Sequence, residues 1–132
     1  MIKFLTFEQV LDMHDALIDK FGGLRGVRDM NLLLSAVETP KTTMFGEDLY
    51  PTIYDKAAAY LYHLVQNHPF NDGNKRTGFG AVYLFLRANG VDMPFDDESF
   101  ENLVIEVAKG EKTKKEISYF LEHAKEQAIF SE

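Results

Sequence analysis

The sequence has 132 residues, 45% of them hydrophobic, and includes 11 Phe and 6 Tyr. This composition predicts a packed globule, and we expect one domain over residues 1–132 because two halves would each be too small for a sufficient core. No cysteine is present, which excludes disulfides and thiolate metal sites. The net charge of −7 argues against binding of nucleic acid or anionic membrane, since both need a basic face.

Apolar runs are short throughout the sequence. The amino-terminal segment lacks the long apolar stretch of a signal peptide. The most apolar run, Ala81 to Leu86, is far too short to span a bilayer. We therefore expect a soluble cytoplasmic protein with no membrane partner.

The first helix is predicted over residues 7–21. Thr6 and Gln9 have the spacing of a capping box, apolar residues follow at helical intervals, and Gly22-Gly23 ends the pattern. His14 lies on the apolar stripe of this helix. We interpret it as a hydrogen-bonded histidine of the core, and the alternative is a catalytic role.

A glycine-rich loop with Arg25 and Arg28 comes next, followed by a short helix from about Asp29 to Glu38. Residues 40–51 contain two prolines and a glycine without a clear period, which predicts a loop or a small hairpin. Such a length is unusual for a connection in a compact domain, and long loops are usually functional or disordered. We expect this one to be functional and to lie next to the junction that starts at His68.

The remaining segments predict an all-α fold of about six helices, because none alternates strictly between polar and apolar residues. These helices cover residues 53–67, 74–89 and 97–110, and a last one starts with a capping box of Thr113 and Glu116. The helix at 74–89 is apolar on most sides, which is typical of the centre of a bundle. Met93-Pro94-Phe95 is a connector, and Asp96 or Asp97 is expected to cap the helix that follows.

Between the two central helices the sequence reads His68-Pro69-Phe70-Asn71-Asp72-Gly73-Asn74-Lys75-Arg76-Thr77. Pro69 cannot continue the incoming helix, and Gly73 tolerates the positive φ of a sharp re-entry. The first N–H groups of the next helix are free, and its positive dipole end attracts anions but disfavours cations. Lys75 and Arg76 in this first turn therefore indicate that an anion binds between them.

This junction contains a base, an acid and an anion cradle. The imidazole of His68 can take a proton from a hydroxyl group, and Asp72 can hold a hard cation such as Mg²⁺. The cradle for phosphate oxygens consists of Gly73, Asn74, Lys75 and Arg76. Together these groups match phosphoryl or nucleotidyl transfer.

Other residues of the junction have structural interpretations. Phe70 is expected to point into the core, and Asn71 and Asn74 to tie the loop backbone together. A zinc site is disfavoured because His63 and His68 are five positions apart, which does not match the usual i, i+4 spacing of helical ligands.

The junction resembles the signature of the Fic/Doc superfamily, in the form carried by death-on-curing (Doc) toxins. The resemblance covers roughly residues 7 to 110 and includes Gly22-Gly23, Leu33 to Pro40, Lys56-Ala57-Ala58 and Phe85 to Gly90. It implies a compact six-helix bundle around a central helix–loop–helix. It also implies an enzyme that uses ATP, or another nucleotide, to modify a hydroxyl side chain of a target protein.

The resemblance also assigns roles to residues. His68 would be the general base, Asp72 a Mg²⁺ ligand, and residues 73–76 the phosphate nest, with Phe70 structural. Residues 40–51 fall where the family has a flap that holds the target segment as an added strand.

Two positions depart from the pattern of Fic adenylyltransferases. Lys75 stands where those enzymes usually have glycine, and Phe79 where they have a second arginine that orients the phosphates for AMP transfer. Doc toxins also lack this arginine, so the resemblance favours transfer of the terminal phosphate by a protein kinase toxin. A translation factor would fit the family as target. The alternatives are an adenylyltransferase and, from another class, a non-catalytic nucleotide-binding module, against which the intact His68 and Asp72 argue.

Regulation has two possible sources in this family. Ser118 and Glu122 have the spacing of the inhibitory Ser/Thr-x-x-x-Glu motif, but His123 follows where Gly or Asn is expected. The alternative is that both are polar residues on a solvated face. The resemblance favours control by a separate antitoxin protein, whose disordered segment would fold as a helix into an apolar groove.

Overall fold

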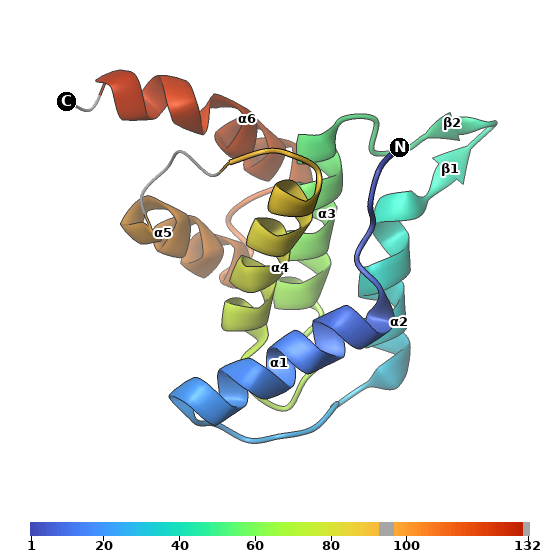
Figure 1. Cartoon of the computed structure of the whole chain (residues 1–132), viewed down its shortest axis with the longest axis vertical. Helices are drawn as coiled ribbons and strands as arrows, with labels where there is room; N and C mark the ends of the chain where they lie inside the picture. The colour runs from blue at the N-terminus through green and yellow to red at the C-terminus, as the bar shows by residue number, and fades with distance from the viewer. Residues whose placement is uncertain (93–96, 131–132) are drawn as a thin grey trace.

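The computed structural model describes residues 1–92 and 97–130, with side chains described up to residue 124. Within these ranges it has the six helices that the sequence predicts (Figure 1). They are α1 (Phe7–Phe21), α2 (Met30–Glu38), α3 (Ile53–Gln66), α4 (Asn74–Ala88), α5 (Asp97–Ala108) and α6 (Lys114–Phe130). A 3₁₀ turn (Thr39–Lys41) and two short strands, β1 (Thr43–Met44) and β2 (Glu47–Asp48), lie between α2 and α3. The all-α prediction is confirmed.

The helix boundaries follow from local capping. Thr6 and Gln9 form the predicted capping box, since each side chain accepts a hydrogen bond from the backbone of the other. Thr113 and Glu116 pair in the same way at the start of α6. Asp97 is the first residue of α5 rather than its cap, and the predicted connector at 93–95 and Asp96 lie outside the described residues.

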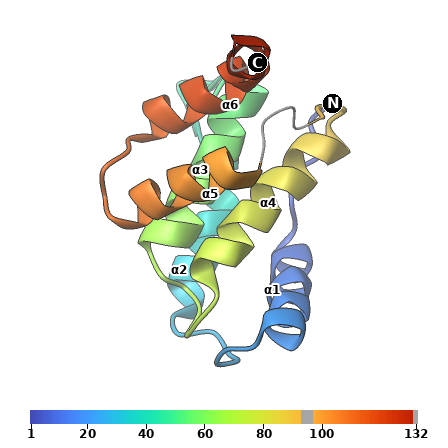
Figure 2. The same ribbon diagram turned by 90° about the vertical axis from the view of Figure 1, so that its left-hand side faces the viewer.

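The centre of the bundle is the pair α3 and α4 (Figures 1 and 2). Helix α3 contacts α2, α4, α5 and α6, and its small residues Ala57, Ala58 and Ala59 are fully buried. Gly78 allows α4 to approach closely, because a Cβ there would lie 2.7 Å from Cγ2 of Val65. No helix in the described part of the chain combines the length and the apolar character needed to cross a bilayer.

Residues 43–48 form a hairpin, in which Thr43 pairs with Asp48. Lys56, which is buried, anchors its base by donating to Asp48 Oδ2 (3.2 Å) and to the carbonyl of Tyr50. The expectation that this segment lies next to the His68 junction is wrong. The segment leads into the start of α3 whereas His68 follows its end, so a helix about 20 Å long separates the two (Figure 1).

A polar cluster joins α3 to the start of α6. The Lys114 ammonium group donates to Nε2 of His63 at 3.2 Å and to the hydroxyl group of Tyr50 at 2.7 Å. Burial, together with the positive charge of Lys114, lowers the pKa of His63 from 6.5 to about 4. His63 is therefore neutral at physiological pH.

This cluster makes stability depend on pH. Because the pKa of His63 is lower in the folded than in the unfolded chain, the unfolded chain takes up a proton first as the pH falls below 6.5. The melting temperature of a His63→Gln variant should therefore fall less than that of the wild type between about pH 7 and pH 5. His68→Gln, which removes a surface histidine, is the matched control. Equal pH dependence of wild type and His63→Gln would contradict the assignment.

Candidate active site

The junction between α3 and α4 opens on a cavity of about 600 Å³. Every residue predicted for the site lines this cavity, namely His68, Asp72, Gly73, Asn74, Lys75 and Arg76. The end of α1 contributes Phe21, Gly22 and Gly23 to its wall. Both views show the junction beside the segment that connects α1 and α2 (Figures 1 and 2).

His68 occupies an unusual backbone conformation just after the end of α3. Its side chain is exposed to the cavity, and its φ of 50° lies in the left-handed region. Helices often end on such a residue, which is usually glycine. For a residue with a Cβ this conformation costs about 1–2 kcal/mol, so the surrounding structure must hold it.

The support comes from residues 24–29, which we call the strap. The strap runs antiparallel to residues 67–72, and Val27 forms a β-bridge with Phe70. Its other contacts are Leu24 N–H to Asp72 Oδ2 (3.1 Å), Asn71 Nδ2 to the Arg25 carbonyl (3.0 Å), Asn71 N–H to the Gly26 carbonyl (3.1 Å) and Arg28 N–H to the Pro69 carbonyl (2.8 Å). The strap thus binds the first half of the junction, residues 68–72.

The side chain of Arg28 completes the strap. Its Nε donates to the carbonyl of His68 at 2.6 Å, and its Nη2 donates to the carbonyl of Asn67 at 2.8 Å. The sequence alone predicts no role for this arginine. The carbonyl groups that Arg28 binds belong to residues 39 and 40 positions further along the chain. The only sign of its importance in the sequence is its place in a basic loop.

Asp72 is tied into the backbone by both carboxylate oxygens. Oδ2 accepts the N–H of Leu24 at 3.1 Å, and Oδ1 accepts the N–H of Gly73 at 2.9 Å. These bonds, and more weakly the positive charge of Arg76, hold the pKa of Asp72 below its usual value. Gly23 makes the approach possible, since its φ is +124° and a Cβ there would lie 2.8 Å from Oδ2. Asp72 is therefore ionised at neutral pH.

His14 contacts the junction from the core of the protein. It is 1% exposed, its Nε2 lies 2.8 Å from the carbonyl oxygen of Asp72, and its ring stacks on Phe70 at 3.7 Å between centroids. Because a carbonyl only accepts, Nε2 carries the proton and donates it. The interpretation of His14 as a hydrogen-bonded core histidine is confirmed, as is the inward position of Phe70, which is 1% exposed.

The start of α4 carries the residues that the sequence predicts to form an anion cradle. Gly73 precedes it with a φ of 77°, and the N–H groups of Asn74, Lys75 and Arg76 have no acceptor within the helix. The side chain of Asn74 does not take part, because its amide bonds to the N–H and the carbonyl of Phe70 at 2.9 and 3.0 Å. Asn74 therefore offers the cradle only its backbone N–H, and its predicted role in tying the loop together is confirmed.

The two cations of this first turn are exposed and line the cavity. The guanidinium group of Arg76 lies over the ring of Phe21, 4.6 Å from its centroid. Phe79, one turn further along α4, packs instead on Phe100 and Tyr83, with centroids 4.5 and 5.1 Å apart. It lines a neighbouring apolar groove of about 510 Å³, which is bordered by α1, α4 and α5.

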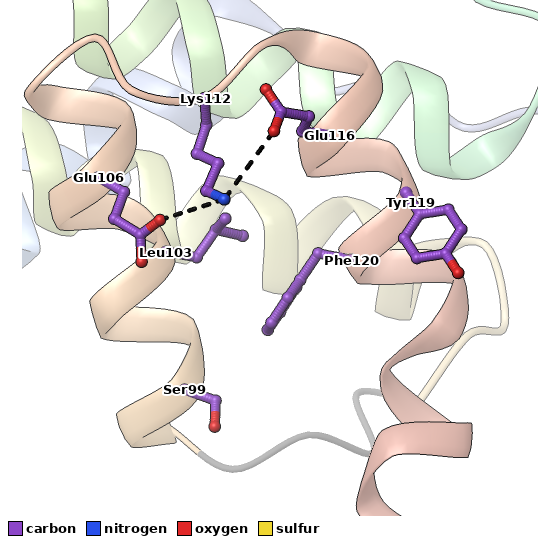
Figure 3. A pocket seen from close by; sticks show the side chains of 7 residues that line it. All are labelled: Ser99, Leu103, Glu106, Lys112, Glu116, Tyr119 and Phe120. Atoms are coloured by element: carbon purple, nitrogen blue, oxygen red, sulfur yellow. Dashed lines mark ion pairs between the residues drawn. The ribbon is translucent and has the colours of Figure 1, made fainter.

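A third hollow, of about 300 Å³, lies between α5 and α6 (Figure 3). Lys112 bridges Glu106 and Glu116 across it at 3.3 and 3.9 Å, and none of the predicted site residues lines it. In the described ranges, no three His, Cys, Asp or Glu side chains are grouped as a metal site.

Ser118 and Glu122 lie away from the cavity. Ser118 is buried and donates to Oδ1 of Asp55 at 2.6 Å, in the first turn of α3, whereas the cavity lies beyond the other end of that helix. The alternative of a solvated face is therefore wrong for Ser118 and holds for the exposed Glu122. Neither residue lines the cavity.

The fold and the cavity define a helical bundle with an exposed histidine beside the first residues of a helix. Residues 4–86 match the Fic/DOC family. The chain is 46% identical to Toxin Doc of Mycolicibacterium smegmatis over 110 residues, which cover 82% of each protein. It is 32% identical to Protein kinase doc of Escherichia phage P1 over 110 residues, or 83% of this chain and 86% of that protein. The chain therefore belongs to the Fic/DOC family, in its Doc branch.

Proposed function

We propose that this protein is a Doc-type toxin that transfers the terminal phosphate of ATP, or of another nucleoside triphosphate, to a Ser or Thr hydroxyl group of a target protein. The observation that carries the proposal is that His68 and the free N–H groups at the start of α4 line one cavity. A base beside an anion site is what a hydroxyl group needs to attack a bound phosphate.

In this reaction the imidazole of His68 accepts the proton of the target hydroxyl group. The hydroxyl oxygen forms a bond to the terminal phosphorus while the bond from that phosphorus to the bridging oxygen breaks. The nucleoside diphosphate leaves with the electron pair of that bond. The N–H groups of residues 74–76 and the side chains of Lys75 and Arg76 stabilise the negative charge of the phosphates.

Asp72 is the residue that would hold Mg²⁺. Its carboxylate lines the cavity, and each oxygen keeps a lone pair after accepting one N–H bond. One carboxylate is sufficient, because Mg²⁺ is usually bound through one or two carboxylates together with substrate phosphates and water. The bound ion would neutralise charge on the phosphates.

Transfer of the terminal phosphate is favoured over transfer of AMP by the surroundings of Phe79. The ring of Phe79 packs on Phe100 and does not line the cavity. The cavity therefore lacks the second guanidinium group that adenylyltransferases have at this position. The similarity to a phage protein named a protein kinase supports the same choice. AMP transfer remains the alternative that the experiment below distinguishes.

The proposal is tested by incubating the protein with Mg²⁺, cell lysate and ATP labelled at either the γ- or the α-phosphate. Label should reach a target protein only from the γ-position. His68→Ala should reduce the labelling by at least about 100-fold, because it removes the general base. Its circular dichroism and melting temperature should stay those of the wild type, since His68 is exposed.

Other outcomes identify the alternatives. Label from the α-position would indicate AMP transfer, and nucleotide binding without labelling of any protein would indicate a non-catalytic binding module. Full activity of His68→Ala would remove His68 from the role of the base.

We propose further that a separate antitoxin restrains this protein, as the similarity to Toxin Doc suggests. The apolar groove beside the cavity is lined by Leu17, Phe79, Val104 and Ile105, and it shares Lys75 and Arg76 with the cavity. An amphipathic antitoxin helix in this groove would bury its apolar face and cover the anion cradle.

A charge placed in the groove should release the toxin from its antitoxin. Ile105 is 42% exposed, so Ile105→Glu should leave the fold intact and desolvate a carboxylate only when the antitoxin binds. Cells that co-express the variant and the antitoxin should stop growing. Leu34→Glu, at an equally exposed position of α2, is the control and should remain restrained. Full restraint of Ile105→Glu would place the antitoxin elsewhere.

A further inference from the structure

Three successive backbone carbonyl groups, those of residues 67–69, accept hydrogen bonds from the strap. The guanidinium group of Arg28 binds the carbonyls of Asn67 and His68, at 2.8 and 2.6 Å. The backbone N–H groups of Arg28 and Asp29 bind the next carbonyl, that of Pro69, at 2.8 and 3.1 Å. The side-chain contacts therefore fall on the peptide groups on either side of the His68 Cα.

These two peptide groups determine the direction of the Cα–Cβ bond of His68, from which the imidazole extends. Peptide groups are planar, so the φ and ψ angles of His68 describe how the two flanking peptide planes are rotated about its Cα atom. The guanidinium group is itself a rigid, planar fork of donors. Because Nε and Nη2 of one fork bind one carbonyl each, the fork fixes the two planes relative to each other.

His68 needs such a constraint for two reasons. Its φ of 50° is disfavoured by its Cβ, and the residue before a proline prefers an extended backbone. Without the guanidinium group, the extended conformation is the available alternative, and it would turn the imidazole away from its present direction.

We infer that Arg28 is a positioning residue, which holds the imidazole of His68 toward the anion cradle. The inference rests on the proposed function for the role of His68. Arg28 does not line the cavity, so its effect passes through His68 and not through contact with the substrate. The rival interpretation is helix capping, in which Arg28 satisfies the last carbonyls of α3 and contributes only stability.

The test compares substitutions of two arginines of the strap. Arg28→Lys keeps the charge but replaces the fork by a single ammonium group, and Arg28→Ala removes both bonds. The matched controls are Arg25→Lys and Arg25→Ala. Arg25 is exposed like Arg28, but its guanidinium group pairs with Asp19 of α1 instead of the junction.

Two measurements are made at a temperature where all variants are folded. The first is steady-state transfer of the γ-phosphate, in which Arg28→Lys should lower kcat about tenfold to 100-fold and leave KM for the nucleotide within about twofold. The second is the NMR signal of the His68 ring, assigned by its loss in His68→Gln. This signal should shift or split in both Arg28 variants and stay unchanged in both Arg25 variants.

Wild-type kcat and an unchanged ring signal in Arg28→Lys would overturn the inference in favour of simple capping. The NMR measurement needs no turnover. If the wild type transfers no phosphate, the proposed function fails, and the ring signal alone then decides whether Arg28 positions His68.

Discussion

The hydrogen bonds between the strap and residues 67–72 are the constraint on which the site depends. A loop between two central helices has backbone groups that neither helix can satisfy, and such groups need partners elsewhere. Here the segment between α1 and α2 supplies them, from Leu24 at one end to Arg28 at the other. The same bonds fix the positions of His68 and Asp72 relative to each other.

Structural and chemical roles coincide within this junction. Asp72 joins the strap to the loop through the N–H of Leu24, and the same residue lines the cavity, where we propose that it holds Mg²⁺. His14 holds the carbonyl of the same residue from the buried side. Asp72 is thus held through both its carboxylate and its carbonyl group before a ligand binds. Little reorganisation of this residue is then needed on binding.

The features of this protein that can be predicted from the sequence are those determined by residues close together in the chain. The capping boxes at Thr6 and Thr113 and the positive φ of Gly73 follow from short patterns, and all three are present. The role of Arg28 did not follow, because its partners lie about 40 positions away along the chain. The hairpin was misplaced although the helix at 53–67 was predicted, because the 14 residues of that helix hold its two ends about 20 Å apart. The side chain of Asn74 was ambiguous because an amide can serve a ligand or a loop equally well.

The most direct test of this account is a crystal structure of the protein with Mg²⁺ and a non-hydrolysable ATP analogue. We expect the phosphates to bind the N–H groups of residues 74–76, with the terminal phosphate nearest the imidazole of His68 and the ion on Asp72. A complex in which the α-phosphate faces His68, or in which the nucleotide binds outside this cavity, would contradict it.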